Sequence, residues 1–173
     1  MISTIFRSHD NVADRVTEEK TCIYNWWATL TMENKRDMMV FLSDNYDNMD
    51  WTALSSNVSD AATSFLLVNP DKINWVNMCL NESNGALVIL SQSRNYDKIV
   101  WTLLSQNKSS GARELLINNF KKISWPHLCL NETSWAIDIL SVNRDKIDPF
   151  MLCYNNHPEA VILMKERFEL NLD

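Results

Sequence analysis

The chain of 173 residues has little glycine and proline, with two Gly and four Pro. Tight β-hairpin turns and phosphate-cradling loops both depend on glycine, so the composition argues against hairpin-rich folds and glycine-rich nucleotide sites. Eight methionines and many leucine, isoleucine and alanine residues suit helices instead. The composition therefore favours an all-α protein.

Two further absences narrow the class of partner. The formal charge is −6, and basic residues gather no more closely than Lys35-Arg36 and Lys121-Lys122. Nucleic-acid binding needs a concentrated positive field, so no nucleic-acid partner is expected. The sequence also has no apolar run long enough to cross a bilayer and no signal-like segment near Met1, so neither membrane insertion nor secretion is expected. The four cysteines are then expected to be reduced.

What the sequence does contain is a repeat. Aromatic anchor residues recur at spacings of 24, 24, 26, 24 and 25 residues, and we name this series the repeat seam: Trp27, Trp51, Trp75, Trp101, Trp125 and Phe150. An Asp-Lys-Ile element precedes several of the anchors, as in Asp71-Lys72-Ile73. Such regularity over most of a chain is typical of repeat architectures.

Each unit predicts two short helices. After the anchor come Leu or Met at +3, Ser or Cys at +4 and Asn at +6, and then an apolar stretch such as Ala86…Ile89-Leu90. Its i, i+3, i+4 spacing marks one face of a helix. The first helix is predicted from the Asp-Lys-Ile element to the Ser or Cys, and the second from just after the Asn through the apolar pair. Helices this short are marginal alone, so neighbouring units must stabilise them.

The predicted architecture is an α-solenoid of about five to six two-helix repeats of 24 to 25 residues, comparable to ankyrin arrays but without β-hairpins. The whole chain, 1–173, is predicted as a single helical-repeat domain. Residues 1–23 form a divergent N-terminal cap, residues 24–157 the repeats, and residues 158–173 a C-terminal capping helix.

The asparagine at +6 creates four Asn-x-Ser/Thr sequences, at Asn57, Asn81, Asn107 and Asn131. In a secreted protein they would suggest glycans. Because each stands immediately before a predicted second helix, we interpret the Ser or Thr as a helix N-cap.

Cys79 and Cys129 occupy the +4 position that other units fill with serine, while Cys153 lies one residue short of it. A small buried side chain at a close helix contact explains them. No Cys-x-x-Cys or Cys/His cluster appears, so no metal site is predicted. Neither a catalytic motif around the three histidines nor a stand-out carboxylate pair is present, so no catalytic residue, cofactor or small-molecule substrate is expected.

Two tryptophans fall outside the seam. Trp135 lies at the start of a second helix, where other units carry Asn84 or Gly111, and is a candidate exposed anchor for a partner protein. Trp26 is as compatible with a core position as with the surface.

The string Asp-Lys-Ile-x-Trp-x-x-Leu-Ser/Cys-x-Asn resembles a short tryptophan-bearing repeat of large nucleocytoplasmic DNA viruses, notably chlorella viruses and mimivirus relatives. Asn69-Pro70-Asp71-Lys72-Ile73-Asn74-Trp75 reproduces that family's characteristic element in full. The family's Asn-Pro-Asn-Ala element before the second helix survives loosely, as His157-Pro158-Glu159-Ala160.

The resemblance implies a viral helical-repeat protein. For a short chain built almost wholly of repeats, it implies a minor capsid protein of an icosahedral virion, binding capsid proteins and located in virions assembled in the host cytoplasm. The alternative is an adaptor that binds a host protein. In both readings the chain is not an enzyme.

Overall fold

The computed structural model describes residue 40 and residues 43–168. The chain divides into two compact units, Met1–Asp50 and Trp51–Asp173. The described part of the first unit includes a short 3-10 helix, η1 (Tyr46–Asn48). The second unit holds the helix pairs.

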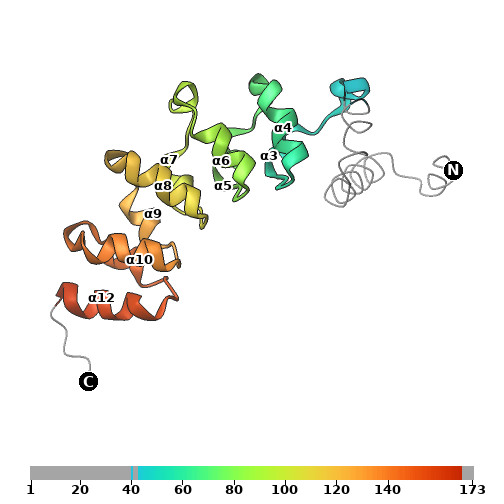
Figure 1. Cartoon of the computed structure of the whole chain (residues 1–173). Helices are drawn as coiled ribbons and strands as arrows, with labels where there is room; N and C mark the ends of the chain where they lie inside the picture. Colours follow the sequence, from blue (N-terminus) through green and yellow to red (C-terminus); the bar gives the residue numbers. More distant parts are fainter. Residues whose placement is uncertain (1–39, 41–42, 169–173) are drawn as a thin grey trace, which may run out of the picture. The chain divides into compact units, whose positions relative to one another are not determined.

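The second unit contains ten α-helices in its described part and no strand (Figure 1). They alternate as first and second helices of five repeats. The first helices are α3 (Trp51–Ser56), α5 (Trp75–Leu80), α7 (Trp101–Leu104), α9 (Trp125–Cys129) and α11 (Pro149–Leu152). The second helices are α4 (Asp60–Val68), α6 (Asn84–Leu90), α8 (Ser110–Asn118), α10 (Ser134–Ser141) and α12 (Pro158–Phe168).

Short 3-10 helices link consecutive repeats. They are η2 (Pro70–Lys72), η3 (Ser93–Asn95), η4 (Phe120–Lys122) and η5 (Arg144–Lys146). First helices pack on first helices, as α3 does on α5, and second helices pack on second helices, as α4 does on α6. The prediction of an all-α fold built from short packed helix pairs is confirmed.

The start of the first helix differs from the prediction. The Asp-Lys-Ile element does not begin the helix: Pro70–Lys72 forms η2, and Ile73 is extended with φ −66° and ψ 125°. The helix begins at Trp75, because the side chain of Asn74 accepts the backbone N–H of Asn77 at 3.2 Å and caps it there. The extended isoleucine enters the core, where Ile73 and its equivalents Ile99, Ile123 and Ile147 are buried.

The N-caps of the second helices match the prediction in three repeats. Ser59, Ser83 and Ser109 each accept the backbone N–H of the alanine three residues later, at 3.2–3.3 Å. Thr133 makes no such bond. Its hydroxyl donates instead to Oδ1 of Asn131 at 2.7 Å.

The core follows the i, i+3, i+4 pattern of the second helices. One alanine and one leucine of each of the first four repeats are fully buried where these helices face the first helices. They are Ala62, Ala86, Ala112, Ala136, Leu66, Leu90, Leu116 and Leu140.

The two glycines of the chain, Gly85 and Gly111, occupy the second position of consecutive second helices. A Cβ on Gly85 would lie 2.0 Å from Oγ1 of Thr63, and one on Gly111 would lie 2.2 Å from Cδ1 of Leu87. Both Thr63 and Leu87 belong to the preceding second helix. Glycine therefore permits the close approach of α6 to α4 and of α8 to α6.

Candidate protein-binding surface

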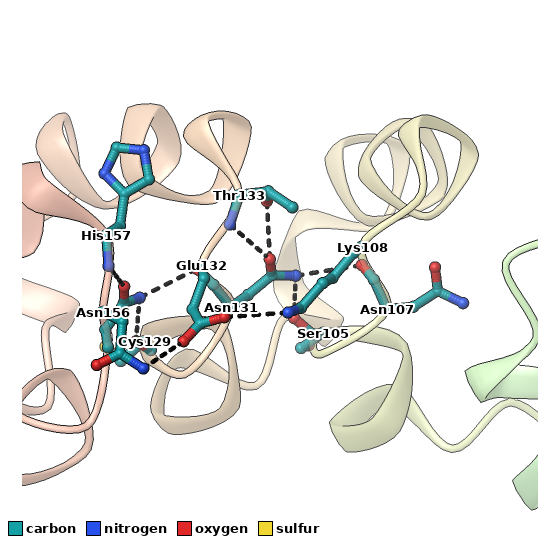
Figure 2. A network of polar contacts seen from close by, with 10 residues as sticks. Ser105, Asn107, Lys108, Cys129, Asn131, Glu132, Thr133, Asn156 and His157 are labelled. Carbon is teal, nitrogen blue, oxygen red and sulfur yellow. Dashed lines mark hydrogen bonds and ion pairs between the residues drawn. The ribbon is translucent and has the colours of Figure 1, made fainter.

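A buried asparagine joins each repeat to the one before it. Asn131 donates from Nδ2 to the carbonyls of Ser105 and Asn107, both at 3.1 Å, and its Oδ1 accepts the backbone N–H of Thr133 at 3.1 Å (Figure 2). The same three bonds recur at Asn81, Asn107 and Asn155, with distances of 2.8–3.2 Å. We name these residues, together with Asn57 at the N-terminal end, the asparagine ladder.

The buried asparagines of the ladder are not glycosylation sites in the folded chain. Asn81, Asn107 and Asn131 are no more than 4% exposed, and both N–H groups of each amide are engaged. An amide in this position is inaccessible to a modifying enzyme in the folded chain. The +6 asparagine therefore forms the hydrogen bonds between repeats. The sequence analysis assigned a role only to the Ser or Thr of this motif and did not predict these bonds.

The Ser/Cys column lies beside the ladder. Ser55 donates from Oγ to the carbonyl of Trp51 at 2.7 Å and accepts the backbone N–H of Asn74, in the next repeat, at 2.9 Å. Cys79 accepts the N–H of Val100 at Sγ, at 3.3 Å. Ser55, Cys79, Ser105 and Cys129 are all 0% exposed, which confirms the predicted small buried side chain.

The buried thiols are kept protonated. Burial raises the pKa of the Cys79 thiol, with an opposing effect from the Val100 N–H, and burial likewise raises the pKa of Cys129. A thiol with a raised pKa has little thiolate at neutral pH, and thiolate is the reactive form. These cysteines therefore act as packing groups and hydrogen-bond acceptors.

The seam tryptophans are half-buried at the first residue of their helices, and each touches another ring or a lysine. Trp51 stacks on Phe65 with ring centroids 5.8 Å apart, and Lys98 Nζ lies 5.0 Å from the ring centroid of Trp75. Trp101 and Trp125 meet the edges of Tyr96 and Phe120 at 6.2 Å and 5.3 Å. Trp27 lies outside the described residues, as do Trp26, Cys22 and His9.

The last repeat is shifted by one residue from the predicted seam. Asn155 occupies the ladder position, so Pro149, the first residue of α11, is the equivalent of Trp125, and Cys153 is the equivalent of Cys129. Phe150 is 67% exposed and packs edge-on against Tyr154 at 5.4 Å. The sequence analysis placed Phe150 on the seam because it aligned the repeats by their aromatic residues. The ladder asparagines show instead which residues of the last repeat are equivalent to those of the earlier repeats.

Trp135 is half-buried rather than fully exposed. Its indole N–H donates to the carbonyl of Lys108 at 3.3 Å, so the ring lies against the preceding repeat. It occupies the helix position of Gly85 and Gly111. Its role as a partner anchor stays a prediction.

The first helices present a surface without formal charge. None of α3, α5, α7, α9 and α11 contains Asp, Glu, Lys or Arg. The second residue of each helix and the residue four positions later lie on one side of the helix. We name these positions the first-helix surface: Thr52, Ser56, Val76, Leu80, Thr102, Gln106, Pro126, Leu130, Phe150 and Tyr154.

The first-helix surface changes character along its length. At α3 it is polar, where Asn77 Nδ2 donates to the carbonyl of Thr52 at 3.1 Å and to Ser56 Oγ at 2.6 Å. At α5 large apolar side chains are exposed, with Val76 at 49% and Leu80 at 47%. The next positions are the polar Thr102 and Gln106, and Leu130 after α9 is half-buried. The surface ends on the exposed Phe150–Tyr154 pair. Exposed apolar groups on an uncharged surface are a feature of binding surfaces.

All second helices except α6 carry charged residues. Their outward positions include the exposed side chains of Asp60, Arg113, Glu114, Asp138, Glu159 and Glu166. The turns between the two helices add one network: Lys108 Nζ lies 3.1 Å from Glu132 Oε2, and Asn156 Nδ2 donates to Glu132 Oε1 at 2.8 Å (Figure 2). These two bonds, with that from Lys108 the larger effect, hold the pKa of Glu132 below its usual range.

In the described part of the chain, no group of three or more His, Cys, Asp or Glu side chains could hold a metal ion. None of the described helices is long and apolar enough to cross a membrane. Comparisons of the chain with protein-family models, curated proteins and solved structures find no match.

Proposed function

We propose that this chain is a non-enzymatic scaffold that binds other proteins through the first-helix surface. The observation that carries the proposal is the absence of charge along five consecutive first helices, combined with exposed apolar side chains at α5 and α11. Charged residues are depleted at the centres of protein interfaces, where aromatic residues and methionine are enriched. The Phe150–Tyr154 pair and the neighbouring Met151 fit that composition.

The repeat architecture supports the same proposal. A stack of repeats offers one extended surface, and each unit can contribute the same side-chain positions to a partner. The net charge of −6 and the scattered basic residues favour a protein partner over nucleic acid.

The narrower form of the proposal is a minor capsid protein that contacts capsid proteins in a large icosahedral DNA virus. Its support is the resemblance of the Asn69–Trp75 element to the viral repeats. The host-directed adaptor is the competing outcome of the test.

The test is quantitative mass spectrometry of native source material fractionated on a density gradient. A capsid role predicts that the chain travels with a very large particle, through salt and detergent washes, at a constant ratio to the most abundant particle protein. Recovery in soluble fractions with one substoichiometric cellular partner would replace the capsid role by the adaptor. Recovery as a free chain without any partner would overturn protein binding altogether.

A matched pair of variants connects the result to the first-helix surface. Leu80→Glu places a charge on that surface, while Val88→Glu places one on the outward side of α6 in the same repeat; the two side chains are 47% and 56% exposed. The first variant is expected to lose the partner and the second to keep it, because an unpaired charge is costly only where the partner removes water. Equal binding by both would place the interface elsewhere.

A further inference from the structure

The links between the described repeats differ in charge. The two outer links, 69–74 and 142–148, have no net charge, because each balances its basic residues with aspartates. The two central links, 91–100 and 119–124, carry four basic residues and one aspartate, which is a net charge of +3 in a chain whose net charge is −6. The basic residues of the central links are Arg94, Lys98, Lys121 and Lys122.

The basic side chains of the central links are exposed and have no carboxylate partner among the described residues. In the outer links, by contrast, Lys72 and Lys146 each lie beside the preceding aspartate, at 4.0 Å and 2.9 Å, and Arg144 is paired with Glu166 at 2.7 Å. The uncompensated positive charge is therefore confined to the two central links.

The charge of the second central link comes from one position. Each link has a lysine immediately before its buried isoleucine, and the residue before that lysine is aspartate in three links and Lys121 in the fourth. The three aspartates are Asp71, Asp97 and Asp145. Because the same link conformation forms with either charge at this position, folding does not require Lys121 to be basic.

An aromatic residue accompanies the charge in the central links. Tyr96 and Phe120 occupy the position that Pro70 and Arg144 fill in the outer links. Both rings pack edge-on against the seam tryptophan that follows them. Phe120 is nevertheless 45% exposed, directly before Lys121. Basic and apolar groups thus share one surface.

The two central links lie on consecutive repeats. Ser124, in the second link, donates its backbone N–H to Oγ of Ser105, which follows α7, at 3.0 Å. Packed helices of neighbouring repeats lie about 8–10 Å apart. An extended segment covers that distance in about three residues. A short extended peptide can therefore contact the basic residues of both links at once.

From this arrangement we infer that the central links bind an acidic segment of a partner protein. We name the surface formed by Arg94, Lys98, Phe120, Lys121 and Lys122 the basic link patch. Carboxylates of the segment pair with the four cations, and an apolar side chain of the segment packs on Phe120. The basic link patch shares no residue with the first-helix surface, so it is a second binding surface that does not rest on the first.

The extent of the basic link patch favours a protein segment over nucleic acid. A phosphate backbone is bound by a continuous positive path. The outer links on both sides have no net charge, and Asp97 interrupts the patch itself. A short carboxylate-rich segment needs only the few cations that are present.

The test is fluorescence anisotropy of a labelled peptide, Glu-Glu-Glu-Leu-Glu-Glu-Glu, titrated with the full chain. Binding is expected at low salt and should weaken as salt is added, because exposed ion pairs are screened. The same peptide with glutamine in place of glutamate should not bind. Since the chain as a whole is acidic, binding requires a local positive surface. Absence of binding at low salt overturns the inference.

A matched pair of variants places the contact. Lys121→Asp gives the second central link the residue type of the other three links and should weaken binding by about tenfold. Arg113→Glu makes the same change of charge at an exposed position of α8 and should bind as the original chain does. Equal weakening by both variants would show that the peptide responds to overall charge, which contradicts the patch. Circular dichroism and thermal melting check that both are folded.

The contact with Phe120 is tested by changing the leucine of the peptide to glycine. This change should weaken binding about threefold for the original chain and not at all for Phe120→Ala. The same loss with both chains contradicts the apolar contact.

A single-stranded DNA oligonucleotide of equal charge tests the class of partner. If the DNA binds more tightly than the peptide and loses binding with Lys121→Asp, the partner is a nucleic acid and the inference is wrong. Because Leu80→Glu and Lys121→Asp change different surfaces, loss of the partner bound by the first-helix surface and loss of the acidic peptide are separate results.

Discussion

First and second helices of the same repeats are joined to their neighbours by different interactions. Between first helices the contacts are directional: the ladder amide of Asn107 bonds to the carbonyls of Cys79 and Asn81, and Ser105 accepts a backbone N–H from the next repeat. Between second helices the contacts are apolar and close, with glycine where the backbones approach most nearly. The outward sides also differ, since the first helices lack charge and all second helices except α6 carry it.

The irregular spacing shows what the directional bonds control. Asn81 and Asn107 are 26 residues apart, whereas Asn107 and Asn131 are 24 apart, yet both ladder steps have the same bonds. The link between the repeats accommodates the two additional residues. Asn95 donates to a carbonyl six residues earlier, Ile89, whereas Asn69, Asn119 and Asn143 make the equivalent bond over four residues. Polar bonds thus hold the register while link length varies.

The largest effect is expected from breaking the ladder. Asn107→Ala removes two donated bonds and two accepted bonds in a position that is 2% exposed. Buried backbone groups are left without partners, so the free energy of unfolding should fall by at least about 3 kcal/mol. Urea unfolding followed by circular dichroism measures it. Asn118→Ala, at an exposed position of α8, is the control and should change stability by less than about 0.5 kcal/mol. Similar losses in both would contradict the ladder's role.

A smaller effect is expected from crowding the second helices. Gly85→Ala places a methyl group 2.0 Å from Oγ1 and 2.6 Å from Cβ of Thr63, atoms close to the backbone that cannot move away easily. The cost of overpacking exceeds the gain in helix propensity, for a net loss of about 1–2 kcal/mol. Gly111→Ala meets mainly the flexible end of Leu87 and should change stability by less than about 0.5 kcal/mol. Thermal unfolding of both variants compares them, and a larger loss for Gly111→Ala would refute this explanation.

The Ser/Cys column gives a pH-dependent test. Burial raises the pKa of Cys79 and Cys129 above the ordinary value of 9.0, so the thiols ionise more readily in the unfolded chain than in the folded chain. Their contribution to stability is present below pH 9 and is lost as the pH rises through the raised pKa. The double variant Cys79→Ser, Cys129→Ser should unfold within about 1 kcal/mol of the original at pH 7, because Ser55 and Ser105 already fill this position.

The decisive comparison is made in alkaline solution. The original chain should lose stability more steeply than the double variant above pH 9, measured by urea unfolding at a series of pH values. Cys153→Ser, at the exposed equivalent, is the control and should follow the original curve. Identical alkaline curves for the original chain and the double variant would show that the buried thiols do not contribute.

The smallest effect is expected at the charged turns. The pKa of Glu132 is lowered by Lys108 and Asn156, so its ionised form is favoured in the folded chain, and this stabilisation is lost as the pH falls below the ordinary value of 4.5. Glu132→Gln should therefore show a shallower loss of stability in acid than the original chain, and added salt should weaken the difference. Glu114→Gln, on the exposed side of α8, provides the comparison.

The sequence alone predicted the repeat, the two helices in each unit and the alanine–leucine core face, because these depend on local periodicity. Ser59, Ser83 and Ser109 were predictable as caps for the same reason, since a cap and its partner are three residues apart. The small side chain at +4 was also readable, because serine and cysteine alternate there.

Tertiary structure decided what the sequence left undetermined. The ladder bonds join groups 24–28 residues apart, so the role of the +6 asparagine depends on how closely repeats stack, which no local pattern specifies. Stacking also places Pro149 rather than Phe150 at the anchor position and turns Trp135 onto the preceding repeat. It leaves the first-helix surface uncovered, because exposure is set by the neighbours of a residue in space and not by its neighbours in the chain.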